Sequence, residues 1–285
     1  MLDLRVATQR LDHAAGMVLE ELHALVNYVP SVMVVGAVCR DALHAALGMT
    51  EQLSATGDLD LALGVEGWEP YETLTAKLDR ITGSGSRIRY RVAGTVVDLV
   101  PFGDVEQPAG EVRLPDRGGE LSVFGFQEVS ASAEPIALAS GAIVRLPTPA
   151  GFTALKLKAW VDRRVYHESK DGKDLATAMS WYQRAPAIHD RLYESADSDR
   201  AARGVLEAVD FDPELGAVML LIRDAMTAIG PTRHEELREL WQTVDDDLLS
   251  TDLQTRRARP HARRQDGTDP RVMAIRAVIS GPSLD

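Results

Sequence analysis

The sequence predicts an α+β protein: an N-terminal mixed β-sheet flanked by helices, followed by a C-terminal helical bundle. Three observations predict this division. In the first half of the 285 residues, short apolar strands alternate with amphipathic helical stretches. Beyond residue 150 the hydrophobic period changes from two to 3.6 and stays there. Pro147-Thr148-Pro149 lies between the two patterns and is typical of a linker, so we place the domain boundary at about residue 148.

The first domain, residues 1–148, contains three predicted helices and six predicted strands. Apolar residues at helical spacing predict helices over residues 9–28, 37–48 and 71–80. Apolar or alternating runs predict strands over residues 31–35, 58–63, 87–92, 95–101, 121–126 and 142–146. Gly94 is a predicted hairpin turn, and the charged, Gly-rich and Pro-rich residues 102–117 are predicted to form a loop.

The second domain, residues 149–250, is predicted to be helical throughout. Its helices are expected over residues 151–166, 176–184, 199–209, 213–229 and 234–249. Residues 251–285 are interpreted as a basic linker and C-terminal tail, in which the short apolar segment 272–279 could dock back. The linker contains five arginines, and a contact with nucleic acid is the alternative to a solvated surface: Arg256, Arg257, Arg259, Arg263 and Arg264.

Composition limits the classes of protein to which the chain can belong. Its single cysteine, Cys39, excludes a disulfide framework and favours a reducing, cytoplasmic location. The N-terminus has no pattern of a signal peptide, and the apolar runs are too short to span a membrane. The net charge of −12 argues against a surface coated with basic residues for nucleic acid, although a local basic groove remains open.

The most informative stretch is Asp58-Leu59-Asp60, which begins an otherwise apolar strand. Because residues i and i+2 of a strand point to the same face, both carboxylates are expected side by side. Their mutual repulsion disfavours folding unless a divalent cation with oxygen ligands offsets it. The alternative is a turn acid after Gly57 followed by a surface acid on an edge strand, and the stretch alone does not decide between the two.

Two further residues bear on that choice. Gly36 follows a buried strand directly and precedes a helix, a position where an anion can approach free N–H groups, although a simple tight turn explains it as well. Asp98 is a lone charge inside Val-Val-Asp-Leu-Val, where an acid is rare unless it is paired, metal-bound or on an edge strand. A hairpin with residues 87–92 can place Asp98 beside the Asp58 and Asp60 strand.

The order of these residues resembles the DNA polymerase β-like nucleotidyltransferases. The resemblance rests on Gly36 after a strand, Arg40-Asp41 in the next helix, Asp58-x-Asp60, and Asp98 on a later strand. Lys156 in a helix, followed by Lys170-Asp171-x-x-Asp174-Leu175, is similar to the motif of the AbiEii/MenT type of that superfamily, which includes toxin–antitoxin toxins. The likeness covers about residues 31–184 and implies a nucleotidyltransferase-type sheet in the first domain.

The resemblance implies a role for each of these residues. Asp58, Asp60 and Asp98 would be catalytic and would bind Mg²⁺, or Mn²⁺, as two ions. Asp98 would hold the ion at the acceptor hydroxyl and help to deprotonate that hydroxyl. Lys156 would be catalytic and lie against the triphosphate. The predicted nucleotide-binding residues are Gly36, Ala37, Arg40, Lys156 and Asp174.

Some of these assignments have structural alternatives. Arg40 either contacts phosphate or pairs with Asp41 or another acid. Asp174 accepts from Lys156 or from the nucleotide, or is a charge that favours a helix N-terminus, an interpretation that fits Asp171 better. The run Gly36-Ala37-Val38-Cys39 lacks the second glycine and the hydroxyl that the family commonly has, which leaves only backbone N–H groups for the phosphates.

The implied reaction is transfer of a nucleoside monophosphate from a nucleoside triphosphate to a hydroxyl, with release of pyrophosphate. The resemblance implies a toxin that acts on tRNA and is controlled by an antitoxin protein, with no membrane partner. Arg87, Arg89 and Arg91 share one strand face and would line a path for an RNA acceptor, or form a solvated surface. The alternatives are a non-catalytic nucleotide-binding regulatory module and a nucleotidyltransferase that modifies a protein or a small molecule.

Overall fold

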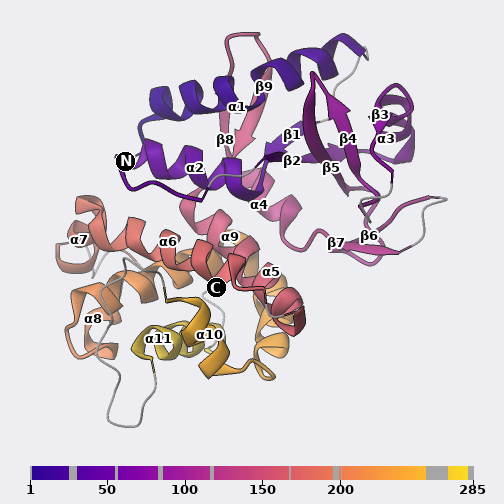
Figure 1. The fold of residues 1–285 in the computed structure, drawn as a ribbon. Coiled ribbons are helices and arrows are strands. Elements are labelled where there is room, and N and C mark those ends of the chain that lie inside the picture. Colours follow the sequence, from indigo (N-terminus) through magenta and orange to yellow (C-terminus); the bar gives the residue numbers. More distant parts are fainter. Residues whose placement is uncertain are drawn as a thin grey trace. The chain divides into compact units, whose positions relative to one another are not determined.

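The computed structural model describes residues 2–25, 31–54, 57–82, 86–115, 119–166, 168–194, 199, 201–254 and 269–281. The chain divides after Thr148 into two compact units, Met1–Thr148 and Pro149–Asp285. Figure 1 shows the elements of both units with their labels. The arginine-rich stretch 256–264, for which the sequence leaves a nucleic-acid contact open, lies outside the described residues.

The first unit is built around a mixed sheet, as the sequence predicts. Over the described residues, the sheet has seven strands in the order β3-β4-β5-β2-β1-β9-β8. Their bounds are β1 (Ser31–Val34), β2 (Asp58–Val65), β3 (Asp79–Arg80), β4 (Arg89–Val92), β5 (Thr95–Gly103), β8 (Glu134–Ala137) and β9 (Ile143–Leu146). β2 pairs parallel with β5, and β1 pairs parallel with β9, while the other neighbours run antiparallel.

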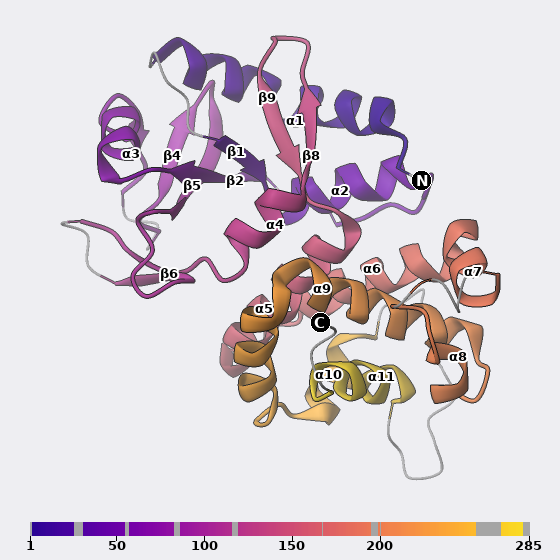
Figure 2. The ribbon, with the colours of Figure 1, turned by 180° about the vertical axis from the view of Figure 1, so that it is seen from behind.

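Helices of the first unit pack their apolar faces against this sheet and against one another. They are α1 (Leu4–Leu25), α2 (Gly36–Ala46), α3 (Trp68–Thr75) and α4 (Phe126–Ser132). α1 and α2 lie side by side (Figures 1 and 2), with Leu11 and Leu43 fully buried. The Glu21 carboxylate of α1 accepts a hydrogen bond from the Ala93 N–H in the β4–β5 turn at 2.8 Å, which ties this helix to the hairpin.

β2 lies in the middle of the sheet, and its alternating pattern gives it two different faces. Leu59, Leu61 and Leu63 are 0–2% exposed, while Asp58 and Asp60 point to the other face. This alternation is the one that the sequence predicts from the period of two. The strand is longer than expected, since it continues through Gly64 to Val65.

Several predictions for the first unit are wrong in detail. The helix expected over residues 71–80 ends at Thr75, and residues 79–80 form the edge strand β3. The loop expected over residues 102–117 contains β6 (Glu111–Arg113), which pairs with β7 (Glu120–Ser122) in a separate two-stranded sheet. The predicted strand 121–126 is short because Phe126 begins α4. These short elements lack a long hydrophobic period, so the pattern does not reveal them.

The regular elements described in the second unit are all helices. They are α5 (Pro149–Arg163), a 3₁₀ turn (Arg164–Tyr166), α6 (Lys170–Arg184), α7 (Pro186–Tyr193), α8 (Val205–Ala208), α9 (Pro213–Trp241), α10 (Asp246–Asp252) and α11 (Pro270–Ile279). Gly230, with φ +74°, interrupts α9 before Pro231, near the break that the sequence predicts between residues 229 and 234. Trp160, Trp181 and Trp241 are fully buried in this unit.

The C-terminal segment of the second unit docks back on its helices, as the sequence leaves open for residues 272–279. α11 packs on α9, where the His234 ring nitrogen Nε2 lies 3.0 Å from the Ile279 carbonyl oxygen. The tail expected over residues 251–285 therefore contains a helix that belongs to the core of this unit. Among the described residues, α9 alone is long and apolar enough to cross a bilayer, and 56% of its most apolar window is buried inside the protein, as in a core helix.

Candidate functional site

The strand register brings the three predicted carboxylates to one face of the sheet. Asp60 on β2 is the direct partner of Asp98 on β5, and Asp58 lies two residues before Asp60 on the same face. Adjacent strands lie about 4.8 Å apart, so the backbones hold Asp60 and Asp98 as close neighbours. The Asp58 side chain is 40% exposed and the Asp98 side chain is 14% exposed, so the cluster lies at the surface of the unit.

Gly36 faces this cluster from the start of α2. A Cβ atom built on Gly36 would lie 2.0 Å from the Asp60 carboxylate oxygen Oδ2 and 2.9 Å from its carbon, so only a glycine fits. Gly36 also has φ +65°, in the left-handed region that favours glycine. The Val35 N–H donates to the Asp60 carbonyl oxygen at 3.1 Å, which fixes the end of β1 beside β2. Asp58, Asp60 and Asp98 therefore lie on one face, with Asp60 directly against Gly36, as the sequence predicts.

Arg89 is the residue that the sequence did not assign to this cluster. It lies opposite Asp98 in the antiparallel β4–β5 pair. Its Nε and Nη2 atoms donate to the two Asp98 oxygens, each at 2.8 Å, and Nη2 also donates to Asp58 Oδ2 at 3.1 Å. The hydrogen bonds to Asp98 raise the pKa of Arg89 above its ordinary value, and the charges of Asp58 and Asp60 add to this effect.

The three arginines expected to share one function have three different environments. Arg89 pairs with the carboxylates, while Arg87 lies against Gly119, where an added Cβ would meet its guanidinium. Arg87 and Arg91 are exposed while Arg89 pairs with the carboxylates, and the path for an RNA acceptor stays a prediction.

The carboxylate cluster fits a divalent cation in residue type but not in its present arrangement. Three aspartates supply the hard oxygen ligands that Mg²⁺ prefers. Within the described ranges, however, no group of three or more His, Cys, Asp or Glu side chains is placed so that it could hold a metal ion. The guanidinium of Arg89 instead takes both oxygens of Asp98 and one of Asp58.

The first turn of α2 can contact a phosphate through backbone groups rather than through side chains. Val35 occupies the position before the helix and has no side-chain oxygen with which to cap it, and no side-chain cap hydrogen bond is formed. The Ala37 side chain is only 2% exposed and packs inward. Any contact of this turn with a phosphate would therefore use its N–H groups, the type of anion site that helix N-termini provide.

Arg40 anchors a loop in this structure. Its side chain is 5% exposed, Nε donates to Asp41 at 2.8 Å, and Nη2 donates to the Ser54 carbonyl oxygen at 2.8 Å. Of the two interpretations left open by the sequence, these contacts support pairing with Asp41. Since Ser54 precedes Asp58 by four residues, Arg40 positions the segment that leads into the acidic strand.

Lys156 of the second unit forms a buried ion-pair cluster. Its Nζ atom lies 2.9 Å from Asp171 Oδ1 and 2.6 Å from Asp174 Oδ2, and 5.7 Å from the centre of the Phe152 ring. Arg163 pairs with the other Asp171 oxygen at 2.9 Å. Asp174 therefore pairs with Lys156, one of the alternatives that the sequence left open. Asp171 is fully buried and lies in the first turn of α6, where an acid favours the helix N-terminus, as the sequence predicts.

The pKa shifts in this cluster follow from burial and charge. Burial alone would lower the pKa of Lys156, but Asp174 and Asp171 outweigh it and raise the pKa above its ordinary value. Burial likewise acts to raise the pKa of Asp171, and the charges of Lys156 and Arg163 lower it overall. Lys156 is thus held as a cation by carboxylates of its own unit, and the sequence motif alone does not reveal this pairing.

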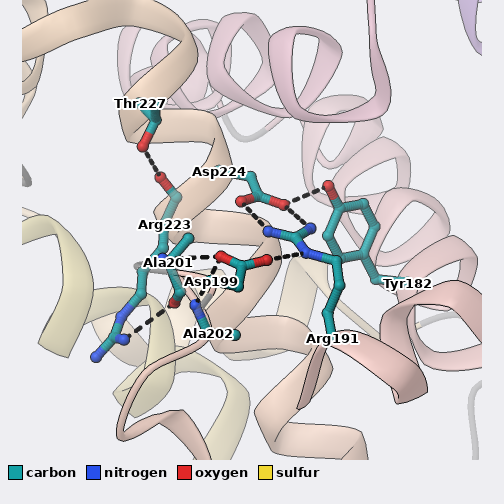
Figure 3. Close-up of polar contacts among 8 residues, drawn as sticks. All are labelled: Tyr182, Arg191, Asp199, Ala201, Ala202, Arg223, Asp224 and Thr227. Carbon is teal, nitrogen blue, oxygen red and sulfur yellow. Dashed lines mark hydrogen bonds and ion pairs between the residues drawn. The ribbon is translucent and has the colours of Figure 1, made fainter. Parts of the chain in front are cut away.

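A second polar network joins helices of the same unit (Figure 3). Arg191 on α7 donates to Asp224 on α9 in a bidentate pair at 2.6 and 2.9 Å and to Asp199 at 2.6 Å. The Tyr182 hydroxyl of α6 donates to Asp224 at 2.7 Å. Burial and the charge of Asp224 raise the pKa of Tyr182. These contacts tie α6, α7 and α9 together, so we interpret the network as structural.

No protein-family model matches the chain, and a comparison with curated proteins finds no match. The function proposed next is therefore supported by the residues and their geometry, together with the family resemblance of the motifs.

Proposed function

We propose that the chain is a metal-dependent nucleotidyltransferase of the DNA polymerase β-like, AbiEii/MenT type, with a nucleotidyltransferase-type sheet and a C-terminal helical bundle. One observation carries the proposal: Asp60 lies in register with Asp98, Asp58 shares their face, and Asp60 packs directly against Gly36. Carboxylates beside a glycine at a strand-to-helix junction are the parts that a nucleoside triphosphate and its cation require.

In the proposed reaction, a hydroxyl oxygen of the acceptor attacks the α-phosphorus of a nucleoside triphosphate. A bond forms between that oxygen and the phosphorus, the bond to the β-phosphate oxygen breaks, and pyrophosphate leaves. We assign Asp98 as the residue that accepts the proton of the acceptor hydroxyl. Mg²⁺ or Mn²⁺ bound to Asp58, Asp60 and Asp98 would neutralise the developing charge. Since the carboxylates do not form a metal-binding group as they stand, we derive no step through the ion.

The acceptor and the biological role are proposed from the resemblance alone. We propose tRNA as the acceptor, a toxin–antitoxin role with an antitoxin protein as partner, and a cytoplasmic location. Lys156 is proposed to approach the triphosphate, which requires it to leave Asp171 and Asp174 at least in part.

A second candidate is a non-catalytic nucleotide-binding module. The observations that favour it are the arginine that pairs with the carboxylates and the buried pairing of Lys156. A third candidate, transfer to a protein or a small molecule, would use the same carboxylates and differs only in the acceptor.

Transfer of label separates these candidates. The protein is incubated with each α-labelled nucleoside triphosphate, Mg²⁺, and total RNA, cell protein or small-molecule extract. Label in tRNA supports the proposal, label in protein or small molecule supports the third candidate, and triphosphate binding without transfer supports the second. Asp60→Asn should abolish transfer while the chain stays folded, whereas the exposed Asp79→Asn should transfer normally. Full activity of the Asp60→Asn variant would refute the assignment.

Expression in a bacterial host tests the proposed toxin role separately. We expect the intact chain to slow growth and the Asp58→Asn variant to leave growth unaffected. Harmless expression of the intact chain at a high level would contradict the toxin role, while the enzyme assignment would still depend on the transfer assay.

A further inference from the structure

We propose that Arg89 is a built-in counter-ion of the carboxylate cluster, which competes with the divalent cation for the same oxygens. This inference rests on the proposed function and extends it to the control of the site. The guanidinium makes three hydrogen bonds of 2.8–3.1 Å to Asp98 and Asp58.

The backbone register places Arg89 directly opposite Asp98. The Ala93-Gly94 turn has positive φ at both residues, +47° and +77°, and it closes the β4–β5 hairpin with Val92 opposite Thr95. Three positions further along, Arg89 stands directly opposite Asp98, with its side chain on the face of the carboxylates. The register of the hairpin therefore brings a cation beside Asp98, while the β2–β5 register brings Asp60 to its other side.

The geometry is that of a strong charge-assisted pair. Two parallel N–H···O bonds to one carboxylate form the fork that suits a guanidinium, and the third bond links the neighbouring strand through Asp58. With Arg89 in place, each oxygen of Asp98 already accepts one hydrogen bond from a cation. A metal ion that approaches Asp98 is repelled by the charge of the guanidinium, so metal binding favours opening of these bonds.

Arg89 is placed so that it can leave. Its side chain is 27% exposed, and the Asp58 end of the cluster is more exposed still, at 40%. Release of the guanidinium moves a charge toward water rather than into the core, so the site can exchange Arg89 for a divalent cation without unfolding the sheet. The apparent metal affinity is the intrinsic affinity multiplied by the fraction of molecules in which Arg89 has left the carboxylates.

Direct binding of Mn²⁺ tests the inference without any measure of enzyme activity. Titration of the full chain, followed by calorimetry or by the paramagnetic signal of free Mn²⁺, is compared for the wild type, Arg89→Ala and Arg91→Ala. Arg91 is the matched control, because it lies on the same strand and face, and its loss changes the net charge equally. We expect Arg89→Ala to bind Mn²⁺ about tenfold more tightly and Arg91→Ala to bind as the wild type does.

Arg89→Gln covers the case in which Arg89→Ala fails to fold, since glutamine keeps an amide donor near the carboxylates but carries no charge. It should also tighten Mn²⁺ binding. The counter-ion inference is refuted if Arg89→Gln, Arg91→Ala and the wild type bind Mn²⁺ equally. If Asp60→Asn also abolishes that binding, the metal assignment stands. Absence of Mn²⁺ binding in every folded variant would overturn both.

Discussion

Replacing Gly36 by alanine tests the close approach of α2 to the acidic strand. Gly36 has φ +65°, and a left-handed conformation costs an L-residue about 1–2 kcal/mol. The added Cβ would also lie 2.0 Å from the Asp60 oxygen Oδ2, so the carboxylate has to leave its position. Displacing a side chain from its rotamer costs a further ~0.5–1.5 kcal/mol. We therefore expect Gly36→Ala to lower the free energy of unfolding by about 1.5–3.5 kcal/mol.

Gly48→Ala is a matched control at the other end of the same helix. Gly48 has φ +73°, and a Cβ there would meet no atom within 4 Å. Gly48→Ala should therefore lose only about 1–2 kcal/mol of stability, which is what the left-handed backbone conformation costs. Urea unfolding at 25 °C, followed by circular dichroism, measures both variants. Hydrogen exchange of peptides from α2 and β2 assigns the loss to the first unit.

A double-mutant cycle with Asp60→Ala isolates the clash. Because Asp60→Ala removes the carboxylate that the new Cβ meets, the double variant should lose less stability than the sum of the two single variants. If Gly36→Ala costs no more than Gly48→Ala, or if the cycle shows no coupling, Asp60 does not lie against Gly36 and the geometric basis of the proposed site is wrong.

Three further predictions concern the buried charges of the second unit. Lys156→Met should lower the free energy of unfolding by about 3–5 kcal/mol, because it removes the cation that pairs with the buried Asp174 and leaves Asp171 with Arg163 alone. In the same urea assay, Lys158→Met should cost under about 1 kcal/mol, since Lys158 forms an i,i+4 pair at the surface. The lowered pKa of Asp171 stabilises the fold above pH 3.8, and that stability is lost as pH falls through the pKa in the folded state, so Asp171→Asn should flatten the acid limb of a stability–pH curve. Because the pKa of Tyr182 is raised, Tyr182→Phe should leave the ultraviolet tyrosine titration near pH 10 unchanged, and a lost step there would contradict its burial.

The sequence predicts the centre of the first unit well because strand patterns specify faces. The alternation of acids and leucines in residues 58–63 identifies the face that carries Asp58 and Asp60, and the hairpin at Gly94 places Asp98 on the neighbouring strand. Short elements such as β6 and α4 were missed, because runs of three to seven residues carry too few periods to distinguish helix from strand.

Arg89 was missed although the signal for it is present in the sequence. With a two-residue turn at Ala93-Gly94, the residue opposite Asp98 follows by counting back from Val92 and Thr95, and it is Arg89. Face alternation alone does not show which of the three arginines on this strand face pairs with Asp98. The length of the turn shows that it is Arg89. The register of the hairpin therefore carries more information about this site than the periodicity of its strands.

The Lys156 cluster shows why a motif cannot replace such counting. A lysine in a helix, followed by two acids, is compatible with a lysine that binds phosphate and with a lysine that the acids neutralise. The choice depends on which atoms share a buried volume, and in α5 and α6 Asp171 and Asp174 both reach Nζ. A buried carboxylate requires a cation, just as Asp98 requires Arg89 or a metal ion. In both clusters, the ion pairs that stabilise the fold compete with the proposed metal and nucleotide for the same charges, so we expect removal of Arg89 to strengthen metal binding.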